Sequence, residues 1–332
     1  MTASAAAVKI RTRRFGHANL FIEKGSLERS AKFYRDVVGL EEVRREPDLD
    51  AILFSTGQTH HDIAVIEASG EERVGLDGQV QIPKGRGKQA GLNHFGWETE
   101  TEALLVDAYR RACDANVNIH RIVDHQIAHS LYIFDPDGNL NEWYADVTKD
   151  WRTVLNPSRT DLVTSTWHIE ESTPIAEPRY HANPQVAVVP DAVFQPVRIN
   201  HAVMITNSFD RMVDHYSNIG GLTAQVFNHG TRYAELRGAA SSLDLVLVEA
   251  SGAERPGLHH LAFRLPSESA MDRSLQRLKE TGTDAILTVD NPHKHSVFVT
   301  DPNGFTLEFF SRRSNRNDAP NLGKDQTLPF FV

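Results

Sequence analysis

Residues 131–144 read LYIFDPDGNLNEWY, and residues 297–310 read VFVTDPNGFTLEFF. In both stretches the tetrapeptide Asp-Pro-x-Gly separates two β-rich runs. It suits a tight turn because Pro fits the second turn position and Gly the fourth. Each stretch therefore predicts two strands joined by a turn. The likeness of the two stretches is the first sign that the second half of the chain repeats the first.

Constant spacing supports this duplication. The step from His94 to His260 is 166 residues, and the same step leads from Glu142 to Glu308. Four stretches also place a histidine at the start of a predicted strand: FGHANLFI from Phe15, GLNHFGWE from Gly91, INHAVMIT from Ile199 and GLHHLAFR from Gly257.

Each of these strands begins a unit of the form β-α-β-β-β. In the first unit Ser26 can cap a helix and Gly39 can end it, and short β-rich runs follow. Paired units of this kind build a cupped sheet. We therefore predict an α+β fold with two domains, each made of two βαβββ modules that form a cupped mixed sheet.

The predicted domain boundaries follow the repeats. Residues 1–150 form the N-terminal pair of modules and residues 198–313 the C-terminal pair. Residues 151–197 contain several prolines and little periodicity, which predicts an ordered linker. Residues 70–90 resemble a mobile surface loop. Residues 314–332 form a polar tail ending in the apolar LPFFV, which could contact a partner subunit or equally its own chain.

Composition narrows the class of protein. The chain has 332 residues, 40% of them hydrophobic, which suits two well-packed domains. The single cysteine, Cys113, excludes an internal disulfide framework and suits a reducing cytoplasm, and we expect its thiol to be buried. Neither a secretory signal nor a membrane span is evident, so we expect a cytoplasmic protein. A net charge of -9 argues against nucleic acid as a partner.

His17, His94 and Glu142 are candidate metal ligands. Two histidines and one carboxylate on one side of an ion leave its other side open for a substrate and O2. The histidines begin the first strands of units one and two, and Glu142 lies on the last strand of unit two, where a buried carboxylate is costly without a cation or a hydrogen-bond partner. A strand histidine alone is more often a core or surface residue, but recurrence at matching positions favours a metal site.

The run from 123 to 142, VDHQIAHSLYIFDPDGNLNE, resembles the signature of the type I extradiol, or catechol 2,3-type, ring-cleavage dioxygenases of the vicinal oxygen chelate superfamily. The resemblance covers most of both halves. It implies that Fe(II), with Mn(II) as an alternative, is held by His17, His94 and Glu142. It also implies that His125 and Tyr132 are catalytic residues.

A second segment matches the same family. Its members carry a His-His pair before a strand, here GQTHHDIAV, which makes His61 the expected acid-base residue beside O2. The substrate-binding residues expected on this ground are Asn19, Arg121 and His129. Arg121 could reach a carboxylate on the substrate, although a plain surface arginine is an equal alternative.

The second half lacks the proton-handling residues. Aligned at the common step, Tyr132 becomes Phe298 and His125 becomes Asn291, and His61 becomes Leu243 when the DIAVIEASG and DLVLVEASG strands are aligned. Its ligand-type residues, His201, His260 and Glu308, remain. We therefore expect a catalytic N-terminal half and a structural C-terminal half with a vestigial site that could still bind a metal.

The resemblance implies an Fe(II)-dependent dioxygenase that cleaves a catechol-type ring with O2 to a ring-opened semialdehyde, in the degradation of aromatic compounds. A homo-oligomer is expected. One alternative is a glyoxalase-like metal-dependent lyase or isomerase, whose fourth ligand could be Glu67. Another is a non-catalytic protein of the same fold that binds an aromatic ligand.

Overall fold

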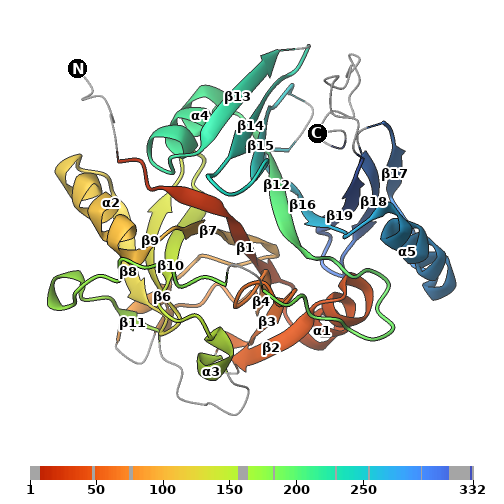
Figure 1. Ribbon diagram of the computed structural model, residues 1–332, viewed down its shortest axis with the longest axis horizontal. Coiled ribbons are helices and arrows are strands. Elements are labelled where there is room, and N and C mark those ends of the chain that lie inside the picture. Colours follow the sequence, from red (N-terminus) through yellow and green to blue (C-terminus); the bar gives the residue numbers. More distant parts are fainter. Residues whose placement is uncertain are drawn as a thin grey trace.

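The structure is a computed structural model. It describes residues 8–46, 49–74, 78–155, 164–181, 184–228, 230–252, 255–292 and 294–313, together with Phe330. Within these residues the chain forms two large mixed sheets and a separate two-stranded one (Figure 1). The predicted α+β fold of two repeated domains is confirmed.

The first repeat, together with β11 from the segment that follows it, builds a nine-stranded sheet in the order β11-β8-β9-β10-β7-β1-β4-β3-β2. Its strands are β1 Thr12–Ile22, β2 Glu41–Glu46, β3 Ala51–Ser55, β4 Ile63–Glu67, β7 Gly91–Thr99, β8 Ile119–Asp124, β9 Ala128–Phe134, β10 Leu140–Asp146 and β11 Ser165–Thr166. Its helices are α1 Leu27–Phe33, continued by a π-helical turn over Tyr34–Val38, and α2 Glu102–Asp114.

The second repeat, β12 to β19, builds an eight-stranded sheet in the order β13-β14-β15-β12-β16-β19-β18-β17. Its strands are β12 Arg198–Thr206, β13 Thr223–Asn228, β14 Arg232–Arg237, β15 Leu245–Glu249, β16 Gly257–Arg264, β17 Leu287–Asp290, β18 Lys294–Thr300 and β19 Thr306–Arg312, and its helices are α4 Phe209–Asn218 and α5 Glu268–Thr281.

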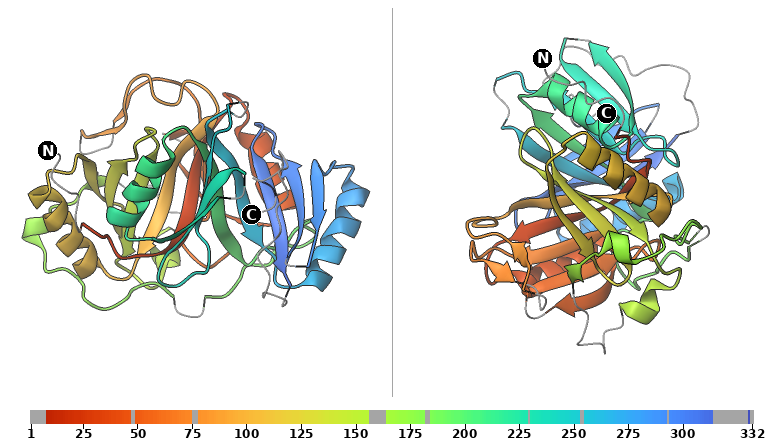
Figure 2. Two further views of the ribbon diagram at one scale, coloured as in Figure 1. Left: turned by 90° about the horizontal axis from the view of Figure 1, so that it is seen from above. Right: turned by 90° about the vertical axis from the view of Figure 1, so that its left-hand side faces the viewer.

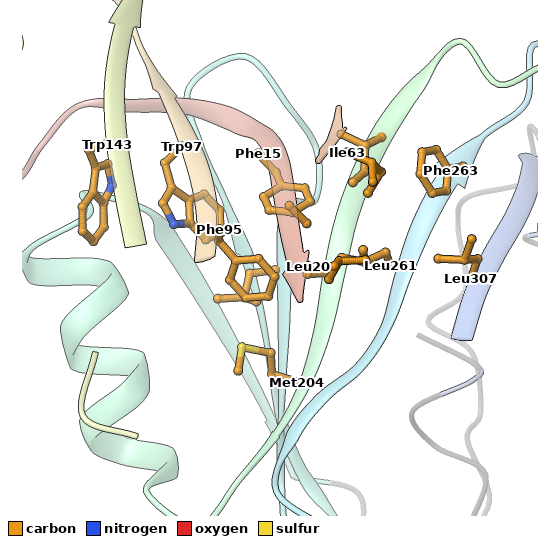
Figure 3. Close-up of a cluster of buried hydrophobic side chains, with 14 of the residues drawn as sticks. Phe15, Leu20, Ile63, Phe95, Trp97, Trp143, Met204, Leu261, Phe263 and Leu307 are labelled. Atoms are coloured by element: carbon orange, nitrogen blue, oxygen red, sulfur yellow. The ribbon is translucent and has the colours of Figure 1, made fainter. Parts of the chain in front are cut away.

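The two repeats share one core. Figure 2 shows β1 and β12 close together between the outer parts of the two sheets, and buried side chains of both repeats form a single cluster. In Figure 3, Phe95 of the first repeat lies beside Met204 of the second, and Leu20 of the first lies beside Leu261 of the second. The repeats are therefore packed as one body.

Reciprocal hydrogen bonds also join the repeats. The carboxylate of Asp62 accepts from the backbone N–H of Ile199 at 3.1 Å, and the carboxylate of Asp244 accepts from that of Phe15 at 2.7 Å. Asp62 and Asp244 begin the matching segments DIAVIEASG and DLVLVEASG. Each repeat thus satisfies a backbone donor of the other, which helps to fix their relative position.

The segments outside the repeats differ in part from expectation. The insert at 70–90 contains a short hairpin, β5 Arg73–Val74 with β6 Val80–Ile82, in place of a bare loop. The segment between the repeats contains α3 Trp151–Val154 and a 3-10 turn at Ile169–Glu171, and its strand β11 pairs with β8.

Two expectations concern single residues. The thiol of Cys113 is exposed, so the expected burial is wrong, because this position falls on the solvent face of α2. Of the tail, Phe330 alone is described, and it packs against Phe298 of its own chain. The remainder of the tail lies outside the described residues, so the alternative of a contact with a partner subunit stays untested.

Candidate metal centre

Three neighbouring strands, β1, β7 and β10, supply the predicted ligands. Nε2 of His17 lies 3.0 Å from Oε2 of Glu142, and Nε2 of His94 lies 3.1 Å from the same oxygen. All three side chains are buried, and one potential ligand atom from each lies within 4.8 Å of the others. Two ligands at right angles, each about 2.1 Å from an ion, are about 3 Å apart, so these distances suit one divalent ion.

A glycine that the sequence analysis did not single out makes this convergence possible. Gly96 of β7 pairs with His17 on one side and with Glu142 on the other. A Cβ at this position would lie 2.1 Å from the imidazole of His17. The absence of a side chain therefore lets the ring of His17 extend across β7 toward Glu142.

The charge of Glu142 also fits a metal. Among the described residues its ion-pair partners are His17, His94 and His125. Burial alone would raise the pKa of Glu142, but these imidazoles outweigh it and hold the pKa well below its usual range. Burial lowers the pKa of His94 to about 4, so this ring is neutral at pH 7 and has a lone pair to donate. A buried carboxylate with no permanent cation beside it is well suited to a divalent ion.

Ser130 orients the carboxylate. Its Oγ donates a hydrogen bond to Oε1 of Glu142 at 2.6 Å, which leaves Oε2 facing the two histidines. Sequence reasoning missed this residue. A serine within the apolar run of β9 was the available signal, because a buried hydroxyl needs a partner.

A cavity opens beside the ligand set and reaches His94 and Glu142. Apolar side chains, among them Ala64 and Ile66 of β4, form part of its wall. The structure also brings together at this cavity five residues that the sequence analysis proposed, which are Asn19, His61, Arg121, His125 and Tyr132.

His125 and Tyr132 form a pair at the cavity. Nε2 of His125 lies 3.0 Å from the hydroxyl of Tyr132 and 3.3 Å from Oε1 of Glu142. Burial and the charge of Glu142 raise the pKa of Tyr132 well above its usual value, so its phenol keeps its proton at pH 7. Thr164, from the segment between the repeats, lies against the other face of this pair, with Oγ1 3.4 Å from Nδ1 of His125.

His60 is a third residue that sequence reasoning missed. Nε2 of His61 lies 3.1 Å from the amide oxygen of Asn19, and Nδ1 of His61 lies 2.7 Å from Nδ1 of His60. An amide oxygen only accepts hydrogen bonds, so Nε2 of His61 carries a proton and its Nδ1 accepts from His60. Burial lowers the pKa of His60 to about 3 and that of His61 well below its usual value, so both rings are neutral.

The same two histidines form another potential ligand group with His17. That group contains no carboxylate, and Nδ1 of each histidine is already paired with the other. The set that includes Glu142 is the better metal site.

Arg121 lies at the cavity wall. Its guanidinium donates to the carbonyl of Gln81 at 2.7 Å and lies 4.2 Å from the centre of the Tyr132 ring. Gln81 belongs to the insert at 70–90, so Arg121 links this insert to the sheet. A carboxylate on a bound ligand would meet the positive charges of Arg121 and Arg86, which both line the cavity.

His129 does not line the cavity. On β9 it lies between Ser130 and Ala128, and successive strand residues face opposite sides of a sheet, so it points away from Tyr132. Its Nδ1 lies 2.7 Å from Glu102 of α2, and its ring stacks on Trp167. Burial would lower its pKa, but Asp124 and Glu102 raise the pKa to about 9. The predicted substrate contact is therefore not supported by this geometry.

Known proteins resemble this chain in sequence and in fold. A family model described as the Glyoxalase/Bleomycin resistance protein/Dioxygenase superfamily matches residues 14–143 and 198–309. The chain belongs to this superfamily. The match covers both repeats, and the resemblance inferred from the signature and the predicted fold are confirmed.

Two relatives of the chain are dioxygenases, and each matches only part of it in sequence. Biphenyl-2,3-diol 1,2-dioxygenase 3 of Rhodococcus globerulus is 26% identical over 129 residues, which are 39% of this chain and 62% of that protein. Catechol-2,3-dioxygenase of Bacillus subtilis is 32% identical over 131 residues, which are 40% of this chain and 41% of that protein. The chain thus matches less than two thirds of either relative.

Solved structures match over nearly the whole chain. A 2,3-dioxygenase from a Pseudomonas species has a TM-score of 0.64 at 17% identity, with 96% of this chain and 98% of that chain covered. The Mn(II)-bound glyoxalase of Novosphingobium aromaticivorans also has a TM-score of 0.64, at 18% identity, with 91% and 82% covered. At these identities the likeness shows a shared fold.

Proposed function

We propose that this protein is an Fe(II)-dependent extradiol dioxygenase, which uses O2 to open a catechol-type ring to a ring-opened semialdehyde during the degradation of aromatic compounds. The observation that carries the proposal is the placement of His61, His125 and Tyr132 at one cavity beside the ligand set. The names of the dioxygenase relatives support it.

His17, His94 and Glu142 would hold the ion. When bound, Fe(II) would hold the two oxygens of the diol and O2 side by side and favour loss of the diol protons. Ser130 keeps one oxygen of Glu142 engaged, so the carboxylate presents its other oxygen to the ion. Mn(II) suits the same ligands and is the alternative metal.

The cavity residues then handle the substrate protons. The phenol of Tyr132 and Nε2 of His125 lie within hydrogen-bond distance of each other and can hold one substrate oxygen between them. The pair can take up the proton that this oxygen loses and return it when the ring opens. This pair would therefore position the substrate and carry its proton.

His61 would act on the side where O2 binds. Its Nε2 carries a proton, because the amide oxygen of Asn19 faces it at 3.1 Å. A neutral N–H donor at the cavity can stabilise a negatively charged oxygen and donate a proton to it. His60 would keep His61 in this tautomer through the contact between their Nδ1 atoms.

The glyoxalase-like alternative needs a further ligand from the region of Glu67. Oε1 of Glu67 accepts a hydrogen bond from the backbone N–H of Leu27 at 3.1 Å, and this side chain does not line the cavity. This position disfavours a lyase or isomerase with four protein ligands. A non-catalytic aromatic-binding protein would have no use for a buried ligand set, and a protein with no affinity for iron or manganese would favour that alternative.

The test is anaerobic reconstitution with Fe(II), followed by a panel of catechols under air with spectroscopic detection of ring-opened products. We expect a new absorption band from the ring-opened product. The amount of this product should equal the amount of O2 consumed. His94→Ala should lose both metal and activity, because it removes a ligand on β7. Activity toward a hemithioacetal without O2, and none toward any catechol, would contradict the proposal.

A further inference from the structure

The second repeat keeps a ligand-type set that is more widely spaced than the first. His201, His260 and Glu308 are buried and lie within reach of one another. Nε2 of His201 and Nε2 of His260 lie 3.8 and 3.4 Å from Oε2 of Glu308. The corresponding distances in the first repeat are 3.0 and 3.1 Å. The second set is thus less well suited to grip one ion.

An alanine explains the wider spacing. Ala262 pairs with His201 on the neighbouring strand, as Gly96 pairs with His17. A Cβ at Gly96 would lie 2.1 Å from the ring of His17, and Ala262 carries that carbon. His201 therefore has less room to approach Glu308 than His17 has to approach Glu142.

A lysine supplies the positive charge in the second set. Nζ of Lys294 lies 2.8 Å from Oε1 of Glu308, and the ion pair is almost completely buried. The residue at this position in the first repeat is Ala128, and there Oε1 of Glu142 accepts from Ser130 instead. The carboxylate of Glu308 is therefore already neutralised by an internal cation, and a divalent ion beside the ammonium would be repelled.

An aromatic side chain lies beside the second ligand set. The ring of Phe330 lies 4.6 Å from that of His259 and 5.0 Å from that of Phe298, and it is parallel to the ring of His260 at 6.3 Å. Phe298 and His260 correspond to Tyr132 and His94, which line the cavity of the first repeat. Phe330 thus occupies the place that an aromatic ligand would take in the first cavity.

We propose that the second repeat is a self-neutralised copy of the metal centre, in which the ammonium of Lys294, bound to Oε1 of Glu308, supplies the positive charge that a metal ion at Oε2 would supply, and Phe330 takes the place of the aromatic ligand. Only the comparison of Phe330 with a substrate ring rests on the proposed function. The replacement of the ion rests on the contacts of Glu308. As a consequence each chain has one metal centre, and the second repeat holds a latent site for a divalent cation.

The test measures Mn(II) bound per chain from the electron paramagnetic resonance signal of free Mn(II). Wild-type protein should bind one ion, and Glu142→Gln should bind none. Adding Lys294→Ala, Phe330→Ala and Ala262→Gly to Glu142→Gln should restore one ion per chain, because the glycine gives His201 the room that Gly96 gives His17. Adding Glu308→Gln should remove this ion again. Lys294→Met, which keeps much of the stem but not the charge, replaces Lys294→Ala if circular dichroism shows that the alanine variant is unfolded.

Two results would overturn the inference. One is an ion in Glu142→Gln that Glu308→Gln removes, because the second set would then bind metal despite Lys294. The other is a folded variant with Lys294, Phe330 and Ala262 all replaced that gains no ion. Wild-type protein without any metal would contradict the proposed function instead, and the ion gained or not gained at Glu308 would still decide this inference.

Discussion

At the scale of single residues, the site depends on which face of a strand each side chain occupies. Ser130 and Tyr132 lie two positions apart on β9, so their side chains point to the same face of the sheet as Glu142 on β10. His129 lies between them and faces α2, where Glu102 pairs with it. One position along a strand thus separates a residue at the cavity from one that supports the fold.

Tyr132→Phe should keep the metal and lose turnover by about 100-fold or more, because it removes a group that handles the substrate proton. The substitution should be tolerated, since Phe298 stands at the same place in the second repeat. Tyr233→Phe is a matched control, because this tyrosine lies on β14 of the second repeat and does not line the cavity. Metal content and kcat should be measured together, and full turnover in Tyr132→Phe would refute the role of this phenol.

His129→Gln should destabilise the protein in a pH-dependent way. The pKa of His129 is about 9 in the folded protein against 6.5 for an unperturbed histidine. The stabilisation is therefore complete below pH 6.5 and is lost as the pH rises through 9. We expect a loss on the order of 2 kcal/mol in the free energy of unfolding at pH 6 and little loss at pH 10.

Urea titrations of wild type and His129→Gln at the two pH values measure this difference. Metal content should stay unchanged, because His129 faces away from the ligands. An equal loss of stability at pH 6 and pH 10 would show that the ion pairs of His129 do not stabilise the fold.

At the scale of elements, the insert at 70–90 forms part of the cavity wall. Gln81, Ile82, Pro83 and Arg86 line the cavity, and the backbone N–H of Gly70 donates to the carbonyl of Gly87. The expectation of a mobile surface loop treated this insert as separate from the site. Its contacts with Arg121 and Asn93 connect it to the strands that carry the site.

Gly87→Ala should raise KM for an aromatic substrate several-fold and leave metal content unchanged. Gly87 has a φ of +64°, and a Cβ there would lie 2.5 Å from the ring of Phe21, so the insert must move. Gly78→Ala is the matched control, with a φ of +79° and no neighbour within 4 Å. Both variants carry backbone strain of roughly 1 kcal/mol, so an equal rise in KM would remove the packing argument.

The sequence predicted most of the elements because the repeats are regular. It predicted the ligand set because ligand types recur at a constant step along the chain. It could not predict Gly96 or His60, since their roles depend on strand register and on a contact between two rings. It also could not predict that Lys294 reaches Glu308. Lys294 begins β18, at the position that Ala128 has in the first repeat, and a lysine at the polar end of a strand is usually a surface residue.

At the scale of the whole molecule, each Asp-Pro-x-Gly turn bonds to the other repeat. The hydroxyl of Tyr216 lies 3.0 Å from Oδ2 of Asp135, and that of Tyr34 lies 3.0 Å from Oδ2 of Asp301. The motif that predicted a turn thus also supplies a buried carboxylate between the repeats. The predicted homo-oligomer stays a prediction. Among the described helices, none combines the length and the apolar composition that a membrane span needs.

Tyr34→Phe and Tyr216→Phe should each lower the free energy of unfolding by about 1–2 kcal/mol, because each removes one of the hydrogen bonds that a buried carboxylate accepts. The double variant should show nearly the sum, since the two sites share no residue. Tyr233→Phe is the control, because Tyr233 stacks on Phe227 within the second repeat. Denaturant midpoints measure the effect, and values equal to that of the control would contradict a joining role for these bonds.

The central claim is that one divalent ion lies between His17, His94 and Glu142. Anomalous X-ray diffraction from crystals of the iron-loaded protein, measured on both sides of the iron absorption edge, locates that ion directly. We predict one peak per chain, about 2.2 Å from Nε2 of each histidine and Oε2 of Glu142. A peak beside Glu308 alone, or no peak beside Glu142 in protein that contains iron, would contradict the account.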